Sequence, residues 1–273
     1  MIPKTIHYCW FNDTPIPYSL QVCMDSWKKN LPDYKWKLWS LKDFDVNSLS
    51  WTKEAFSVGA LAFVADYVRL HALYTEGGIY MDTDVMVKKS FDPLLSNGFF
   101  TAIEYHPEMI EGDEMAGKRL GPDGTNRFPG VRVPGLGLLS AILGAERGHP
   151  YLVEAMKFYE GRHFIQEDGS WYTKEIAPDV LALAAEKFGL KYNNEIEQQL
   201  EERMLILPSR ILGAAWKQVT DDTIAVHLSK GSWRKLHGYG AFLQNLIFIE
   251  RFQGSEVIIG GSKRFTLSFI LYG

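Results

Sequence analysis

The stretch that most constrains the fold is "AFVADYVRLHALYTEGGIYMDTDV", residues 62–85. Apolar side chains recur at helical spacing from about residue 60 to Glu76, which predicts a long helix, and Gly77 favours a left-handed C-cap. The apolar run "IYM" then predicts a short strand that ends at Asp82 and Asp84. A helix joined by a glycine pair to an apolar strand is typical of an α/β sheet, in which ligands collect at the carboxyl ends of strands. The sequence therefore predicts a ligand site at these two aspartates.

The rest of the chain extends this pattern of strands and helices. In chain order, apolar periodicity predicts a strand at 4–10, a helix at 19–30 with Ser19 as its N-cap, strands at 35–39 and 99–104, helices near 151–159 and 179–188, and a strand at 223–228. This alternation predicts a mixed central sheet flanked by helices. Residues 106–134 are rich in Gly and Pro without clear periodicity, which predicts a long loop that is either functional or disordered.

Composition excludes several classes of protein. A chain of 273 residues with 46% hydrophobic residues can bury a large core, and no linker divides it, so we expect one domain. The net charge of −4 arises from well-mixed charges, which argues against nucleic-acid binding. Cys9 and Cys23 are too few for a disulfide framework and are expected to be free thiols. The N-terminus lacks the pattern of a signal peptide, and no apolar run approaches the ~20 residues of a membrane span, so we expect a cytoplasmic protein.

Asp82 and Asp84 are candidate metal ligands. In an extended strand, residues two apart point to the same side, so the two carboxylates would converge while Thr83 faces away. Such an oxygen-rich site suits Mg²⁺ or Mn²⁺, which often bridge the phosphates of a substrate. A solvated turn is the alternative interpretation of the same pattern, because aspartate is common in turns.

A second polar pair lies upstream, in "FVADYVRL". Asp66 and Arg69 are three residues apart and therefore share one face of the predicted helix. They are either a surface ion pair or part of the site, since the helix leads through Gly77 and Gly78 back to the aspartates.

Several separate stretches together resemble glycosyltransferase family 32. They are "IPKTIHYCWF" at the start, "PDYKWKLW" from residue 32, the central block at 62–85, "GHP" at 148–150 and "AVHLSKGSW" at 225–233. The resemblance covers about residues 2–233, and its central block is the most specific part. It implies a GT-A fold, similar in its core to the large glucosylating toxins, a nucleotide-sugar donor, a divalent metal and transfer with retention of anomeric configuration.

The resemblance also implies roles for the central residues. Asp82 and Asp84 would be the DxD pair, with Asp84 the more direct metal ligand and Asp82 reaching metal-bound water, ribose or sugar. Asp66 and Arg69 match the pair that holds the donor sugar.

Four further residues would complete the site. Trp10 matches the aromatic residue that stacks on uracil, and His227 resembles a metal-binding histidine of related retaining transferases. Lys230 and Trp233 would contact the diphosphate. From the residues alone, a core position is the alternative for both Trp10 and His227.

The expected function is metal-dependent transfer of a hexose or N-acetylhexosamine from a UDP-sugar to a saccharide acceptor in surface or capsular polysaccharide synthesis. Mn²⁺ or Mg²⁺ is the expected cofactor. The single domain would comprise a nucleotide-sugar half at 1–105, an acceptor half at 106–235 and an extension at 236–273. That extension is expected either to pack as a core helix or to contact the membrane that carries a lipid-linked acceptor.

Two alternative functions remain open from the sequence. A haloacid-dehalogenase-type phosphatase also has two aspartates after an apolar strand, but here the motif lies deep in the chain, and Met86 stands where that motif has Thr or Val. A sugar-nucleotide binding protein without activity is the other alternative, which the intact DxD pair argues against. No carboxylate is evident as a covalent nucleophile, which favours front-face exchange as the route to retention.

Overall fold

The computed structural model describes residues 1–12, 14–112, 115–213, 218–228, 257–258 and 264–265. The chain divides into two compact units, Met1–Lys230 and Gly231–Gly273. In the second unit, the described residues form one antiparallel strand pair, β11 (Val257–Ile258) with β12 (Arg264–Phe265). Lys230, Trp233 and most of the expected extension at 236–273 lie outside the described residues.

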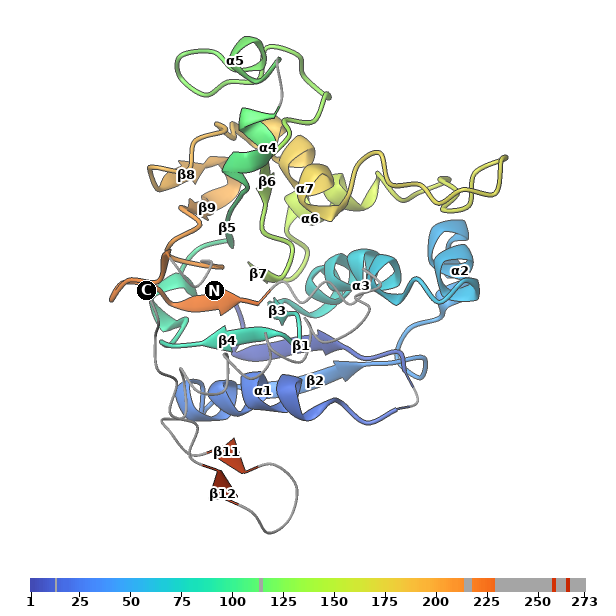
Figure 1. The fold of residues 1–273 in the computed structure, drawn as a ribbon, viewed down its shortest axis with the longest axis vertical. Coiled ribbons are helices and arrows are strands. Elements are labelled where there is room, and N and C mark those ends of the chain that lie inside the picture. The colour runs from blue at the N-terminus through green and yellow to red at the C-terminus, as the bar shows by residue number, and fades with distance from the viewer. Residues whose placement is uncertain (13, 113–114, 214–217, 229–256, 259–263, 266–273) are drawn as a thin grey trace. The chain divides into compact units, whose positions relative to one another are not determined.

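A mixed sheet of eight strands forms the centre of the first unit (Figure 1). Its strand order is β2-β1-β3-β7-β5-β9-β8, and β6 pairs with β5. The strands are β1 (Thr5–Cys9), β2 (Lys35–Trp39), β3 (Gly78–Met81), β5 (Phe99–Tyr105), β6 (Leu136–Leu138), β7 (Ile142–Ala145), β8 (Gln198–Leu200) and β9 (Met204–Leu207). β1 runs parallel to β2 and β3, and β7 runs antiparallel to β3 and β5. The predicted mixed α/β sheet is confirmed.

Helices flank this sheet. They are α1 (Tyr18–Asn30), α2 (Ser50–Ser57), α3 (Leu61–Glu76), α4 (Pro107–Glu111), α5 (Ala116–Arg119), α6 (Pro150–Met156) and α7 (Ala177–Ala185), with short 3₁₀ turns at Val46–Ser48, Asp92–Leu94, Glu186–Phe188 and Glu201–Arg203. The C-cap of α3 is Gly77, with φ +68° and ψ 173°, so the expected positive φ is present with an extended rather than left-handed helical ψ. An added Cβ at Gly77 would lie 2.7 Å from the backbone nitrogen of Arg147, which also requires glycine there.

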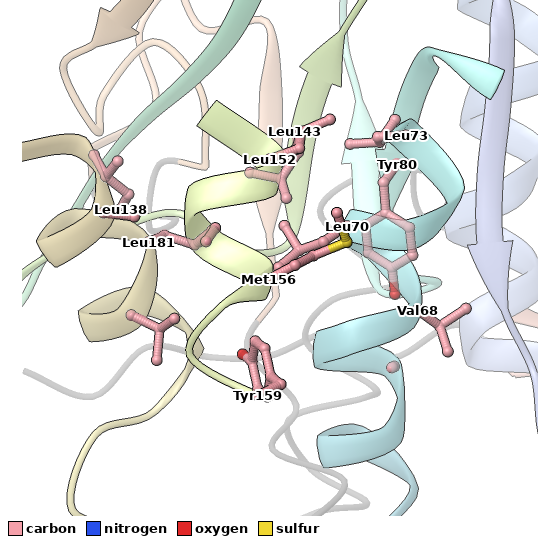
Figure 2. Packing of buried hydrophobic residues seen from close by; sticks show 14 of the residues in the cluster. Val68, Leu70, Leu73, Tyr80, Leu138, Leu143, Leu152, Met156, Tyr159 and Leu181 are labelled. Atoms are coloured by element: carbon pink, nitrogen blue, oxygen red, sulfur yellow. The ribbon is translucent and has the colours of Figure 1, made fainter. Parts of the chain in front are cut away.

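Alternation along β3 divides the core into two clusters, one for each face of the sheet. Tyr80 packs with residues of α3, α6 and α7, including Leu73, Met156 and Leu181 (Figure 2). Ile79 and Met81 instead join the cluster that contains Trp27 of α1 and the strands β4 (Val85–Val87) and β10 (Ala225–His227). Because side chains alternate along a strand, the next residue after Met81 is directed to the same face as Tyr80.

Two local expectations are wrong. Ser19 is not an N-cap, because α1 begins at Tyr18 after Pro17 and no side chain caps it. The stretch 106–134 is not a plain loop, since it contains α4 and α5 and is tied to the chain near α7 through hydrogen bonds from Asn126 and Gly130 to Glu186. Cys9 and Cys23 are both thiols and form no disulfide, as expected. None of the helices in the described residues has the length and apolar character needed to cross a bilayer.

Candidate active site

The two aspartates lie in a turn between β3 and β4. The backbone N–H of Val85 donates to the Asp82 carbonyl oxygen at 3.0 Å, which closes a four-residue turn directly after Met81. The expectation that both aspartates lie on an extended strand is therefore wrong. Strand alternation reaches only Asp82, whose Oδ1 accepts a hydrogen bond of 2.8 Å from the hydroxyl of Tyr80 on the same face. The turn, rather than strand periodicity, directs Asp84.

β10 brings His227 to this turn. β10 pairs antiparallel with β4, and His227 stands opposite Val85 in the register. The backbone N–H of Leu228 donates to the Asp84 carbonyl oxygen at 3.1 Å, which extends the pairing past Val85. One potential ligand atom each from Asp82, Asp84 and His227 lie within 4.8 Å of one another. The fold thus assembles the three residues expected to bind metal.

The imidazole of His227 and the nearby carboxylates interact strongly by charge. His227 Nε2 lies 3.4 Å from Asp84 Oδ1, and the two side chains are 18% and 15% exposed. Burial lowers the pKa of an imidazole, but the negative charges of Asp84, Asp82 and Glu104 outweigh this effect and raise the pKa of His227 to about 9. Without a metal, His227 therefore carries a proton at neutral pH, and that positive charge stands where a cation would offset the carboxylates.

The chemistry of these side chains fits a divalent metal. Two carboxylates and one imidazole offer hard oxygen donors and one nitrogen donor, a combination that suits Mn²⁺ and, with its oxygen preference, Mg²⁺. All three side chains are partly exposed, which leaves access for a substrate oxygen. Among the described residues, this is the one group of three or more His, Cys, Asp or Glu side chains with this spacing.

Asp66 and Arg69 form a buried ion pair beside the cluster. Arg69 Nη2 lies 2.8 Å from Asp66 Oδ1 and 3.7 Å from Asp82 Oδ1, and the Arg69 side chain is 5% exposed. The interpretation as a surface ion pair is therefore wrong. Burial, opposed by the charge of Arg69, raises the pKa of Asp66 to about 6. A carboxylate that is costly to keep ionised is frequently part of a functional site.

The guanidinium of Arg69 is held from several sides. Its Nε donates to the Ala65 carbonyl oxygen at 3.1 Å, and its Nη1 donates to the Ser140 carbonyl oxygen at 2.6 Å. Its charge centre also lies 4.8 Å from the ring centroid of Tyr80. These contacts anchor the positive charge between Asp66 and Asp82.

Trp10 directly follows β1 at the same edge of the sheet. The register pairs His7 with Tyr80, which places Cys9 level with Asp82. The Trp10 side chain is half-buried, and its Nε1 donates to the Thr14 carbonyl oxygen at 2.7 Å. Its place at this edge fits a ring that stacks on a base, and that role stays a prediction.

Two residues beside the site were not predicted from the sequence. Tyr80 contacts Asp82, and the signal for it was its position two residues before Asp82 on the same strand. Glu104 is the second-last residue of β5; its Oε1 lies 3.1 Å from His106 Nε2, and its charge contributes to the raised pKa values of Asp66 and His227. The sequence offered Glu104 no distinguishing signal beyond its place at a strand end.

Residues 17–100, which include the two aspartates, are similar to a known protein family. Residues 17–100 match the family model described as "Glycosyltransferase sugar-binding region containing DXD motif", which includes Asp66, Arg69, Asp82 and Asp84. This segment is therefore similar to a glycosyltransferase sugar-binding region. Trp10 and His227 lie outside the match.

Two curated relatives come from Schizosaccharomyces pombe. Inositol phosphoceramide mannosyltransferase 3 is 27% identical over 163 residues, which covers 57% of this chain and 36% of the relative. Inositol phosphoceramide mannosyltransferase 1 is 34% identical over 122 residues, which covers 42% of this chain and 38% of the relative. The chain thus spans little more than a third of the length of these relatives.

Solved glycosyltransferase structures are similar to this chain at low identity. PaToxG glycosyltransferase is 17% identical with a TM-score of 0.45, over 68% of this chain and 69% of that one. The galactosyltransferase LgtC, solved with donor and acceptor sugar analogues, is 15% identical with a TM-score of 0.40, over 89% of this chain and 94% of that one.

Proposed function

We propose that this protein is a metal-dependent GT-A glycosyltransferase that moves a sugar from a nucleotide-sugar donor to a saccharide acceptor. The observation that carries the proposal is the grouping of Asp82, Asp84 and His227 within 4.8 Å at the carboxyl end of β3, beside the buried pair of Asp66 and Arg69. The match of residues 17–100 to a sugar-binding region with a DXD motif supports it independently.

The chain's own residues divide the work at this site. Asp82, Asp84 and His227 would hold the cation, with Asp84 the most direct ligand. A bound Mn²⁺ or Mg²⁺ supplies positive charge that stabilises the departing nucleoside diphosphate. Asp66 and Arg69 would orient the donor sugar, since the carboxylate accepts hydrogen bonds from sugar hydroxyls and the guanidinium holds that carboxylate in place. Trp10 would stack on the base, whereas the residues expected at the diphosphate, Lys230 and Trp233, lie outside the described residues.

Retention would proceed by exchange on one face of the sugar. The acceptor hydroxyl oxygen bonds to the anomeric carbon as the bond to the diphosphate oxygen breaks, and the hydroxyl proton passes to the departing phosphate. Burial of Asp66 and Arg69 keeps water from these charges and strengthens their hold on the sugar.

The donor and acceptor classes are proposed from the motif pattern and from the names of the two fungal relatives. A UDP-hexose or UDP-N-acetylhexosamine is the donor class proposed from the motif pattern, and the two fungal relatives, which are named mannosyltransferases, add mannose as a candidate for the transferred sugar. For the acceptor we propose a saccharide of surface or capsular polysaccharide synthesis. Because both relatives are named for inositol phosphoceramide, a lipid, we also propose a lipid-linked acceptor, with the enzyme in the cytoplasm beside the membrane that carries it.

A donor panel tests this function without an acceptor. UDP- and GDP-linked hexoses and N-acetylhexosamines are incubated with the full chain and Mn²⁺, and release of free sugar and nucleoside diphosphate is followed. We expect slow hydrolysis of one donor that stops in EDTA and in Asp84→Asn, whereas Asp168→Asn, in an exposed turn, serves as the matched control. Release of inorganic phosphate alone would indicate a phosphatase, and binding without turnover would indicate a non-catalytic sugar-nucleotide protein.

A further inference from the structure

Tyr80 is a buried tyrosine whose hydroxyl contacts the candidate metal site. Its side chain is 1% exposed and lies among the apolar residues beside α3 (Figure 2). The Tyr80 hydroxyl donates a hydrogen bond of 2.8 Å to Oδ1 of Asp82. A phenol hydroxyl that donates a hydrogen bond to a carboxylate restricts the rotation of that carboxylate.

Arg69 holds the ring of Tyr80 and at the same time competes for Asp82. Its charge centre lies 4.8 Å from the ring centroid, while its Nη2 is 3.7 Å from the same Oδ1 that accepts from Tyr80. A distance of 3.7 Å is too long for a hydrogen bond but short enough for electrostatic attraction, because the Arg69 side chain is 5% exposed and the Asp82 side chain 28% exposed. Asp82 is therefore drawn toward Arg69 and restrained by Tyr80.

We propose that Tyr80 is a positioning residue that keeps the Asp82 carboxylate directed to the point it shares with Asp84 and His227. Because Oδ1 is occupied by the phenol, the remaining oxygen is available to a cation. Without the hydroxyl, Asp82 closes on Arg69 and withdraws from that point. The inference rests on the proposed function in that the shared point holds a divalent metal, and residues in such a supporting role commonly change metal affinity by about 10 to 100-fold.

Tyr151 provides a matched control for the loss of a buried phenol hydroxyl. Its side chain is fully buried, and its hydroxyl donates to the Leu181 carbonyl oxygen at 2.9 Å, between α6 and α7. Tyr80→Phe and Tyr151→Phe each remove one oxygen from a buried ring and one hydrogen bond to an oxygen acceptor. A purely structural role for Tyr80 predicts that the two variants behave alike.

The test measures Mn²⁺ alone, by titrating the full chain and following free Mn²⁺ by electron paramagnetic resonance, with melting temperature recorded in parallel. Tyr80→Phe is expected to weaken Mn²⁺ affinity about 10-fold or more, while Tyr151→Phe binds Mn²⁺ like the wild type. In an Asp82→Asn background, Tyr80→Phe is expected to add little further loss, because both changes act through one carboxylate.

Two results would overturn the inference in distinguishable ways. Equal Mn²⁺ affinity in Tyr80→Phe and wild type, or additive losses with Asp82→Asn, would leave Tyr80 a packing residue while the proposed function stands. No Mn²⁺ binding by the wild-type chain would remove the metal from the proposed function and this inference with it. Since Tyr80→Phe keeps the ring and its contacts, a change in melting temperature no larger than that of Tyr151→Phe shows that the fold survives.

Discussion

The antiparallel pairing of β4 and β10 brings His227 beside Asp84 in the preceding turn, with His227 Nε2 3.4 Å from Asp84 Oδ1. Because the pKa of His227 is raised to about 9, a metal that uses this imidazole must displace a proton at neutral pH. We expect release of close to one proton for each Mn²⁺ bound at pH 7.5, and an affinity that rises with pH and levels off above about 9. Calorimetry in buffers of different ionisation enthalpy measures this proton release.

The same pair gives an opposite trend for the metal-free protein. A pKa raised above its unfolded value means that the His227–Asp84 attraction stabilises the fold fully below about pH 6.5 and is lost as pH rises through about 9. Melting temperature in EDTA should therefore contain a component that falls over this range and is missing in His227→Gln. An unchanged proton count in that variant would exclude His227 as a ligand.

Asp66→Asn is predicted to separate stability from activity. Its raised pKa, about 6, means that ionised Asp66 costs the fold more as pH rises from about 4 to above 6. The neutral amide avoids this cost, so melting temperature relative to wild type should increase between pH 5 and pH 8. Sugar transfer or donor hydrolysis should fall by at least about 100-fold while nucleoside diphosphate affinity changes little. Loss of nucleotide binding in the folded variant would give Asp66 another role.

Trp10→Ala is predicted to weaken nucleotide binding without changing Mn²⁺ affinity. Loss of one base-stacking ring is expected to lower UDP affinity by about 10-fold, measured by calorimetry with Mn²⁺ present. Trp171→Ala is the control, because Trp171 is likewise accessible, at 45% exposure, but lies in the turn region after His163. Equal UDP affinity in both variants would make Trp10 a packing residue.

Gly144→Ala is predicted to destabilise the sheet. An ideal Cβ at Gly144 would lie 2.0 Å from Cε1 of Phe100, a fully buried ring on the neighbouring strand. Such overpacking should cost on the order of 3 kcal/mol in unfolding free energy, measured by urea denaturation. Gly112→Ala, where φ is −81° and the added Cβ would lie 3.4 Å from the Glu108 carbonyl oxygen, should cost well under about 1 kcal/mol. Similar losses in the two variants would contradict the packing argument.

Local patterns in the sequence predicted the elements that position the site, but not how they meet. The periodicity before Gly77 correctly gave α3 and β3, because helix and strand periods are set by residues close together in the chain. The turn after Met81 was missed, since Asp82 and Asp84 two residues apart fit a strand equally well. The strands β7 and β9 were missed because four-residue apolar runs such as Ile142–Ala145 fit several structures.

The position of His227 could not be obtained from periodicity at all. Nothing near residue 227 in the chain indicates β4 as its partner, and only the likeness of "HLSKGSW" to a family pattern pointed to the cluster. The contact between Tyr80 and Asp82 follows from alternation, yet its competition with Arg69 depends on a helix that crosses the same face.

The pairing of β10 with β4 also bears on the order in which the chain can fold. Asp82 and Asp84 directly follow β3 in the sequence. His227, in contrast, lies in β10, which follows every strand of the eight-stranded sheet in the sequence. Pairing β10 with β4 closes a long loop, and the entropic cost of that closure grows slowly with loop length. β10 is only three residues long, so its pairing supplies few contacts to offset this cost. We therefore expect the ligand set to assemble late in folding, and a cation bound by all three residues would act as a cross-link whose removal first loosens β10 from β4. Hydrogen exchange at Val226 would register that loosening before any change in the central strands.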